Sequence, residues 1–169
     1  MIPSPQDMFC SREAAAHGRA VRVVEAGAVA TTSAFAGGAL LSQTVIVPNW
    51  RAMDPTVFLA HFGTSGPATG ATLFPFELAS VLLLGITTYR AVRRRRTARY
   101  VWAIATASMI GSLLLVPIYF WHANAAMLDP SFPLQAVPAE LTAWYGWNWA
   151  RTALGLLAAA LTWAALAAG

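Results

Sequence analysis

Hydrophobic residues along this chain fall into four long segments that are separated by short polar links. Each segment holds about the 20 apolar residues that a helix needs to cross the hydrocarbon core of a bilayer. The segments are residues 21–47, 67–89, 100–121 and 143–168. Little chain remains outside them, so the pattern predicts an all-α integral membrane four-helix bundle over residues 21–169, preceded by a polar tail over residues 1–20.

Prolines and glycines predict where the segments end on one side of the membrane. Val47–Pro48 is expected to end the first helix, with Trp50 at the membrane interface. Asp54–Pro55 has the pattern of a helix N-cap followed by a first-turn proline. It predicts a short interfacial helix over residues 56–62 in the first outer loop, ended by Gly63–Gly66.

The composition agrees with a membrane protein and indicates its orientation. The chain is 57% hydrophobic and 11% charged, whereas soluble proteins carry roughly 25% charged residues. All basic residues are arginines, and the net charge is +4. They gather before the first segment and in the link at residues 90–99. Short arginine-rich loops stay in the cytoplasm, so we expect both termini inside and the protein in a bacterial cytoplasmic membrane.

The arginine run Arg93–Arg96 has two interpretations. Its position between two membrane segments favours an anchor on anionic membrane lipid, and it argues against nucleic acid as a partner. The single cysteine excludes an intrachain disulfide. The sequence contains no glycine-rich phosphate loop, nucleophile elbow, dinucleotide fingerprint or haem-attachment motif, which excludes several common enzyme classes.

Two opposite charges lie inside predicted membrane segments. Glu77 follows Pro75 in the second segment, and Arg151 is in the fourth. Charges in hydrocarbon are costly, and they usually face a bundle interior, a partner charge or a cavity. One interpretation is a structural pair that fixes the register of two helices. The other is a catalytic pair, in which Arg151 binds an anionic or enolate oxygen and Glu77 accepts a proton.

Other polar and aromatic residues are expected at the outer half of the bundle. His122 is a second candidate for the catalytic base, and Asn148 shares a helix face with Arg151 because the two are three residues apart. The candidate substrate-binding residues are Asn124, Asn148, Trp144 and Trp147.

His61 and His122 also raise the hypothesis of a metal site. Imidazole suits copper, iron and zinc, and we expect copper or iron if the site binds O₂. The spacing of these two histidines carries no metal-binding signature, and hydrogen bonding at the membrane interface is the more common role of such histidines. Oxidation without any cofactor is the alternative.

Several short motifs together resemble a known family. They are Val47–Pro48 at the end of the first segment, Val116–Pro117 before Asn124, and Trp144 or Trp147 followed by Asn148 and Arg151–Thr152. In these motifs the chain resembles the anthrone-oxygenase-like family of small four-span membrane proteins, from about Val24 to Leu166.

The resemblance implies a four-helix bundle and, from the better-known members, oxygen insertion into an anthrone to give an anthraquinone. Relatives often have a histidine near the position of Asn148, which is asparagine here. From the resemblance as a whole we expect a membrane-embedded oxidoreductase, a monooxygenase acting on a hydrophobic aromatic substrate. The competing hypotheses are a non-catalytic accessory subunit of a larger membrane complex, and a transporter element that would work as a homo-oligomer.

Overall fold

The computed structural model describes residues 5–168 as helices joined by short links, with side chains described for residues 18–168. Most of the predicted polar tail therefore lies outside the described side chains, although the first helix begins at Pro5. The elements in order are α1 (Pro5–Leu41), η1 (Ser42–Ile46), α2 (Val47–Arg51), α3 (Pro55–Arg93), α4 (Arg99–Leu115), η2 (Val116–Phe120), α5 (Trp121–Leu128), η3 (Leu134–Ala136) and α6 (Val137–Ala167). Both η1 and η2 are π-helical turns, and η3 is a 3₁₀ turn.

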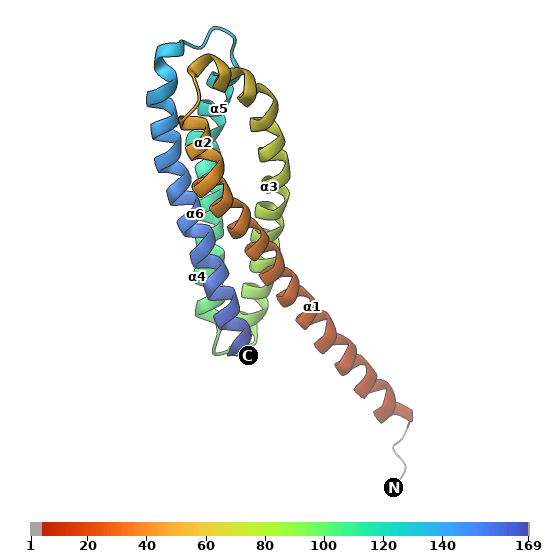
Figure 1. Ribbon diagram of the computed structural model, residues 1–169. Helices are drawn as coiled ribbons and strands as arrows, with labels where there is room; N and C mark the ends of the chain where they lie inside the picture. Colours follow the sequence, from red (N-terminus) through yellow and green to blue (C-terminus); the bar gives the residue numbers. More distant parts are fainter. Residues whose placement is uncertain (1–4, 169) are drawn as a thin grey trace.

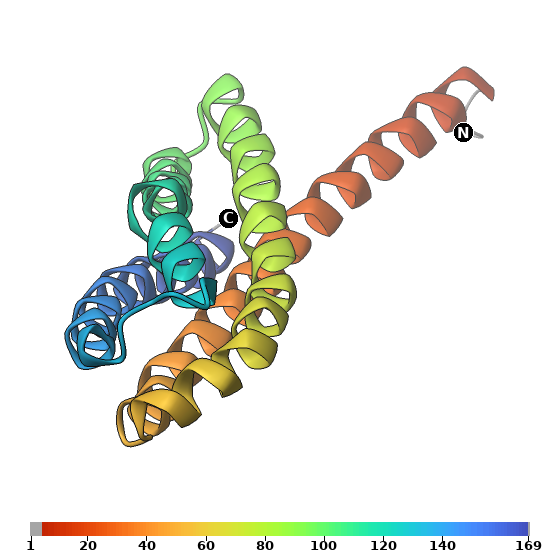
Figure 2. The same cartoon turned by 90° about the horizontal axis from the view of Figure 1, so that it is seen from above.

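Consecutive elements join into four rods, so the predicted all-α fold with four long helices is confirmed, and each rod is long and apolar enough to cross a membrane. Within residues 5–168 the rods are Gly18–Arg51, Pro55–Arg93, Arg99–Leu128 and Leu134–Ala167. In Figure 1 the α3–α4 link and the end of α6 lie at the lower end of the bundle, and the other two links lie at the upper end. The N-terminal part of α1 extends away from the bundle in both views (Figures 1 and 2).

The rods form a ring in the order α1, α3, α4, α6. Both α1 and α4 pack against α3 and against α6, and the view from above shows the same arrangement (Figure 2). Helices α3 and α6 are therefore diagonal partners across the interior. Any side chain that joins them has to cross the centre of the bundle.

The upper ends of the first and third rods lie beyond the predicted ends at residues 47 and 121. Pro48 does not end the first rod, which continues through η1 and α2 to Arg51. In the same way Pro117 lies inside η2, and the third rod continues to Leu128. A proline lacks one backbone donor and crowds the preceding turn. In both rods the proline lies in or just after a wider π turn, which relieves the crowding.

The predicted short helix at residues 56–62 is not a separate element. It forms the first turns of α3, which continues through Gly63–Gly66 and through Pro67 and Pro75. The N-cap prediction was right, since the Asp54 side chain accepts a hydrogen bond from the Thr56 backbone N–H at 2.9 Å. Hydroxyl groups then bond back to carbonyls four residues earlier, for example Ser65 to His61 at 2.9 Å. Such bonds are compatible with a continuous helix.

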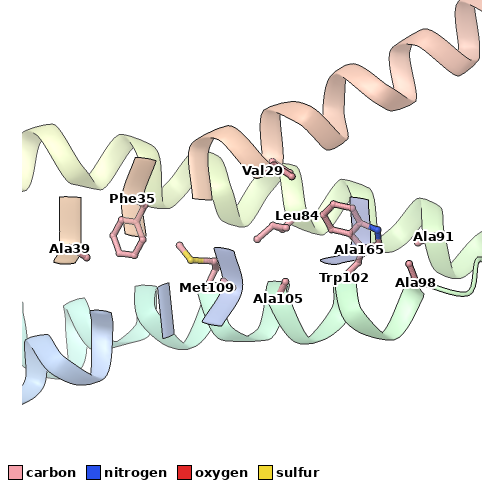
Figure 3. Close-up of a cluster of buried hydrophobic side chains, with 12 residues drawn as sticks. Val29, Phe35, Ala39, Leu84, Ala91, Ala98, Trp102, Ala105, Met109 and Ala165 are labelled. Carbon is pink, nitrogen blue, oxygen red and sulfur yellow. The ribbon is translucent and has the colours of Figure 1, made fainter. Parts of the chain in front are cut away.

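Buried apolar residues form two separate clusters, one at each end of the bundle. The lower core consists of Ala28, Val29, Phe35, Ala39, Leu84, Ala91, Ala98, Trp102, Ala105, Met109, Ala158 and Ala165, most of which Figure 3 labels. The upper core consists of Val47, Trp50, Phe58, Phe62, Phe120, Ala123, Met127, Val137, Leu141 and Trp144. Small side chains dominate the lower core, which lets the helix backbones approach closely in a bilayer.

The turn after α3 has a left-handed residue that is not glycine. Arg95 has a φ of 51°, a conformation that costs an ordinary residue roughly 1–2 kcal/mol. The Arg96 backbone N–H bonds to the carbonyl of Ala91 at 3.0 Å, and that of Arg95 bonds to Val92 at 3.0 Å, as in a Schellman helix ending. This turn directs Arg96 back toward α1, where it forms an ion pair with Glu25.

Candidate functional site

A layer of buried polar side chains separates the two apolar cores. On every rod these residues fall, in sequence, between the members of the upper core and those of the lower core. They are Ser42 and Gln43 on the first rod, Glu77 and Ser80 on the second, Ser112 on the third, and Asn148 and Thr152 on the fourth. With the partly buried Arg151 they form the central polar layer. The layer therefore lies between the two apolar cores.

Glu77 and Arg151 are in direct contact, as the sequence analysis expected. Arg151 donates from Nη2 to Oε2 of Glu77 at 2.5 Å and from Nε to Oε1 at 3.3 Å. Ser112 donates its hydroxyl to Oε1 at 2.6 Å. The Glu77 side chain is fully buried, and that of Arg151 is 13% exposed. Because its side chain is fully buried in this pairing and does not line the adjacent cavity, Glu77 can accept a proton from a bound molecule only after the pairing opens.

The ion pair joins the diagonal helices α3 and α6. Arg151 therefore crosses the centre of the bundle and passes the aromatic rings of the other two rods. Its guanidinium carbon lies 5.1 Å from the ring centre of Phe35 and 5.6 Å from that of Phe120. These distances are within the range of a cation–π interaction. The carboxylate holds one edge of the guanidinium and the two rings restrict its plane, so its orientation is fixed.

Arg151 retains hydrogen-bonding capacity beyond the ion pair. A guanidinium has five N–H donors, and the two printed bonds to Glu77 use only Nε and Nη2. Within the described part of the chain, no hydrogen bond from Nη1 to an acceptor is formed. Arg151 also lines a mainly apolar cavity in the upper half of the bundle. These donors are available to an oxygen of a bound molecule.

The cavity beside Arg151 has a volume of about 110 Å³. Its lining residues are Ser42, Trp50, Phe62, Gly66, Thr69, Gly70, Leu73, Phe74, Val116, Phe120, Asn124, Trp144 and Arg151. Six of them belong to consecutive turns of α3, and of these Phe74 is 43% exposed. The opening of the cavity therefore follows α3, whose outward face would be in contact with lipid. We name this space the Arg151 cavity.

The two π turns shape this cavity. Ser42 is in η1, and Val116 and Phe120 are in η2, so each turn contributes to the lining. A π turn adds a residue to one helical turn and rotates the following side chains, and such turns occur often at functional sites. Prolines 48 and 117 accompany these turns. Two of the three motifs on which the family resemblance rests, Val47–Pro48 and Val116–Pro117, therefore lie in or beside the two π turns.

Asn124 and Trp144 lie at the cavity, as expected. Trp144 donates from Nε1 to the side-chain oxygen of Asn124 at 3.0 Å, and both residues line the cavity. Trp147 does not line it. Its ring stacks on Tyr119 with ring centres 5.3 Å apart and planes inclined by 16°, and the residue is 39% exposed.

Asn148 has a role that the sequence analysis did not anticipate. Its amide donates to the side-chain oxygen of Gln43 at 2.7 Å, and the Gln43 amide donates to the Tyr145 carbonyl at 3.5 Å. Asn148 and Gln43 are both buried, and neither lines the Arg151 cavity. This amide pair joins the neighbouring helices of the first and fourth rods, so it fixes their register beside the ion pair.

The two candidate metal ligands, His61 and His122, are both exposed, and neither lines the Arg151 cavity. Among the residues that the structure describes, no group of three or more histidine, cysteine, aspartate or glutamate side chains is close enough to hold a metal ion. The structure therefore does not bring His122 to Arg151, where a catalytic base would act.

Sequence reasoning missed four residues of this site: Phe35, Gln43, Ser112 and Phe120. For Gln43 a signal was present, because a long polar side chain in an apolar segment usually faces a partner. Ser112 carried a weaker signal, since serine is common in membrane helices. Phe35 and Phe120 carried none, because an aromatic residue in a membrane segment does not reveal which side chain it will contact.

Fold and site together define the class of protein. It is a bundle of four helical rods, each able to cross a membrane, in which a buried ion pair joins two diagonal helices beside an aromatic-lined cavity. Comparisons of the chain with family models, with curated proteins and with solved structures found no match.

Proposed function

We propose that the chain is a membrane-embedded oxidoreductase, an anthrone-oxygenase-like monooxygenase whose hydrophobic aromatic substrate binds in the Arg151 cavity. The observation that carries the proposal is a fixed guanidinium with unused donors at an apolar, aromatic-lined cavity. Such a group stabilises an anionic oxygen strongly because water is largely excluded there. The aromatic lining suits a flat ring system. The family resemblance supplies the type of reaction.

The proposed chemistry is oxidation of an enolate by O₂. An anthrone-like substrate loses a proton from the carbon opposite its carbonyl, and the resulting enolate oxygen pairs with Arg151. The enolate carbon then reacts with O₂. One oxygen atom becomes the new carbonyl, and the other leaves as water with the two hydrogens of the original CH₂ group. Glu77 acts in this scheme as a positioning residue that holds Arg151, and it takes the proton only when the pair opens.

The size of the cavity limits how a substrate binds. Small-molecule sites usually measure roughly 300–1,000 Å³, and this cavity measures about 110 Å³. The cavity suits the oxygen-bearing ring of the substrate, while the other rings remain along α3 in the lipid. The exposed residues of α3 at the cavity edge favour this entry route. The substrate would then arrive from within the membrane rather than from water.

The orientation of the protein is part of the proposal. The arginine-rich link after α3 and both termini face the cytoplasm, and the Arg151 cavity lies in the outer half of a bacterial cytoplasmic membrane. The first turns of α3, residues 56–62, lie at the outer interface. The distribution of arginine supports this orientation, since six arginines lie in the 90–99 link and Arg51 is the one arginine at the upper helix ends.

The test is conversion of anthrone by the purified protein in lipid vesicles. O₂ uptake and the absorbance of the quinone product measure the rate. Gly70 lines the cavity and has open space around its Cα, so Gly70→Leu should fill the cavity and reduce turnover at least about tenfold. Gly63→Leu is the matched control, because Gly63 is on the same helix, also has open space, and lies outside the cavity. It should leave turnover unchanged.

Equal turnover in Gly70→Leu and Gly63→Leu would move the reaction away from the Arg151 cavity. Wild-type turnover in both Glu77→Gln and Arg151→Gln would remove the proposed mechanism altogether. If the wild-type protein converts no substrate but purifies from its host in a fixed ratio with another membrane protein, the accessory-subunit hypothesis replaces the enzyme.

A further inference from the structure

A second cavity lies at the lower end of the bundle, and the proposed oxygenation does not use it. It measures about 410 Å³. Its walls come from α1, the end of α3, the following turn and α6. The lining residues are Gly18, Val21, Arg22, Glu25, Arg90, Arg94, Arg96 and Leu166. We name it the arginine cleft.

The arginine cleft has an excess of positive charge. Four of its lining residues are arginines and one is a glutamate, so the lining carries a net charge of +3, which is four minus one. Glu25 is 6% exposed and pairs with Arg96. The left-handed turn at Arg95 directs Arg96 to that pair. The lining contains no second carboxylate to balance Arg22 and Arg90.

Arg90 gives a more specific indication of a ligand. Its Nη1 atom is buried and has no hydrogen-bond partner among the described residues. A buried charged donor without an acceptor is costly, and proteins rarely retain one. Arg90 is in the last turn of α3 and lines the cleft. An anion held in the cleft would provide the acceptor that this donor lacks.

The chemistry of the lining favours a phosphate group. Arginine presents a planar set of donors that matches phosphate and carboxylate oxygens. The position of the cleft identifies the source, because it lies where the helical rods end, at the level of membrane headgroups. Val21 and Leu166 line the cleft, and the nearby apolar residues Val23 and Val92 are 70% and 51% exposed. A phospholipid would use both features, with its phosphate in the cleft and its chains along these apolar faces.

We propose that the arginine cleft binds the phosphate group of an anionic membrane phospholipid. This lipid site is independent of the Arg151 cavity, because the two lie at opposite ends of the bundle and share no lining residue. The arginine run after α3 would then include a defined binding site in addition to a diffuse charge that orients the protein.

The test is lipid binding to the delipidated full-length protein in detergent, measured by native mass spectrometry. Phosphatidylglycerol should bind at least about tenfold more tightly than phosphatidylcholine. Arg90→Gln should weaken phosphatidylglycerol binding about tenfold, the size expected for one lost charge-assisted hydrogen bond. Arg93→Gln is the matched control, since Arg93 is exposed, lies on the same helix and is outside the cleft. It should change binding by less than about twofold.

A second variant and a competition experiment can also contradict the proposal. Arg22 is exposed at the cleft, so Arg22→Gln should fold normally and weaken binding even if Arg90→Gln does not fold. Inorganic phosphate and glycerol 3-phosphate at millimolar concentration should not displace the lipid. Equal losses in the Arg22 and Arg93 variants would indicate diffuse surface charge and overturn the proposal. Displacement by either soluble phosphate would also overturn it, because the cleft would then bind phosphate from solution.

Discussion

Arg151 makes two kinds of contact that have different consequences. The bonds to Glu77 neutralise a charge at the centre of the membrane, where an isolated charge would be costly. The rings of Phe35 and Phe120 add cation–π contacts and keep the guanidinium in one plane. A buried ion pair often contributes little net stability, because desolvation offsets the attraction between its charges. Its retention here fits a functional arginine whose orientation must be fixed.

A double-mutant cycle at the residue scale tests this interpretation. Glu77→Leu or Arg151→Met alone leaves one charge buried without a partner, and each should lower the free energy of unfolding by roughly 3–5 kcal/mol. The double variant removes both charges and should be far more stable than the sum of the single effects predicts, yet it should not bind substrate. Reversible unfolding in mixed micelles measures the stability. Additive single effects would show that the two side chains do not act as a pair.

At the scale of an element, α6 buries a stripe of residues three or four positions apart. The stripe changes character along the helix, from large residues at the upper end to small ones below Asn148: Val137, Leu141, Trp144, Asn148, Thr152, Gly155, Ala158, Thr162 and Ala165. Small residues allow α1 to approach closely. A Cβ added at Gly155 would lie 2.9 Å from a ring carbon of Phe35. Gly155 therefore leaves room for a ring that flanks Arg151.

Gly155→Ala should consequently destabilise the protein and disturb the site. Phe35 is fully buried, so its ring cannot move aside easily, and overpacking of this kind costs roughly 1–3 kcal/mol. Gly146→Ala is the control on the same helix, because nothing lies within 4 Å of the added Cβ there. It should be neutral or stabilising by up to about 1 kcal/mol through helix propensity. Thermal unfolding of both variants in detergent measures the difference, and equal effects would contradict the role of Gly155.

At the scale of the whole molecule, the two ends of the bundle differ in chemistry. The lower end carries the arginine cleft and the α3–α4 link, and the upper end carries the aromatic residues of the upper core. Between them lies the central polar layer with Arg151 and its partners. This asymmetry is the physical basis of the proposed orientation, because arginine-rich links are retained in the cytoplasm.

Cysteine labelling tests the orientation. In a Cys10→Ser background, Thr97→Cys and Pro130→Cys place single thiols at exposed positions in the links at the lower and upper ends. A membrane-impermeant maleimide should label Pro130→Cys in intact spheroplasts and Thr97→Cys only after permeabilisation. The reverse pattern would place the Arg151 cavity on the cytoplasmic side and would contradict the proposed orientation.

Hydrophobic periodicity predicted the fold class and the four rods because a span of about 20 apolar residues has few structural solutions in a bilayer. It failed at the upper helix ends. Pro48 was interpreted as the end of the first helix and Pro67 as the start of the second, yet each lies inside a helical rod. In water a proline in a helix usually breaks it, whereas in a membrane bundle π turns and hydroxyl groups satisfy the backbone. That compensation depends on neighbouring structure, which periodicity does not reveal.

For the candidate site, the sequence by itself determined which residues were exceptional: a glutamate and an arginine in apolar segments must find partners because hydrocarbon offers none. It therefore predicted the Glu77–Arg151 contact. Only the tertiary structure decided that α3 and α6 are diagonal, so that the arginine crosses the interior between Phe35 and Phe120. Likewise only packing separated Asn148 from the cavity and left His122 exposed. Charge makes a partner necessary, but the arrangement of the helices determines which side chains surround it.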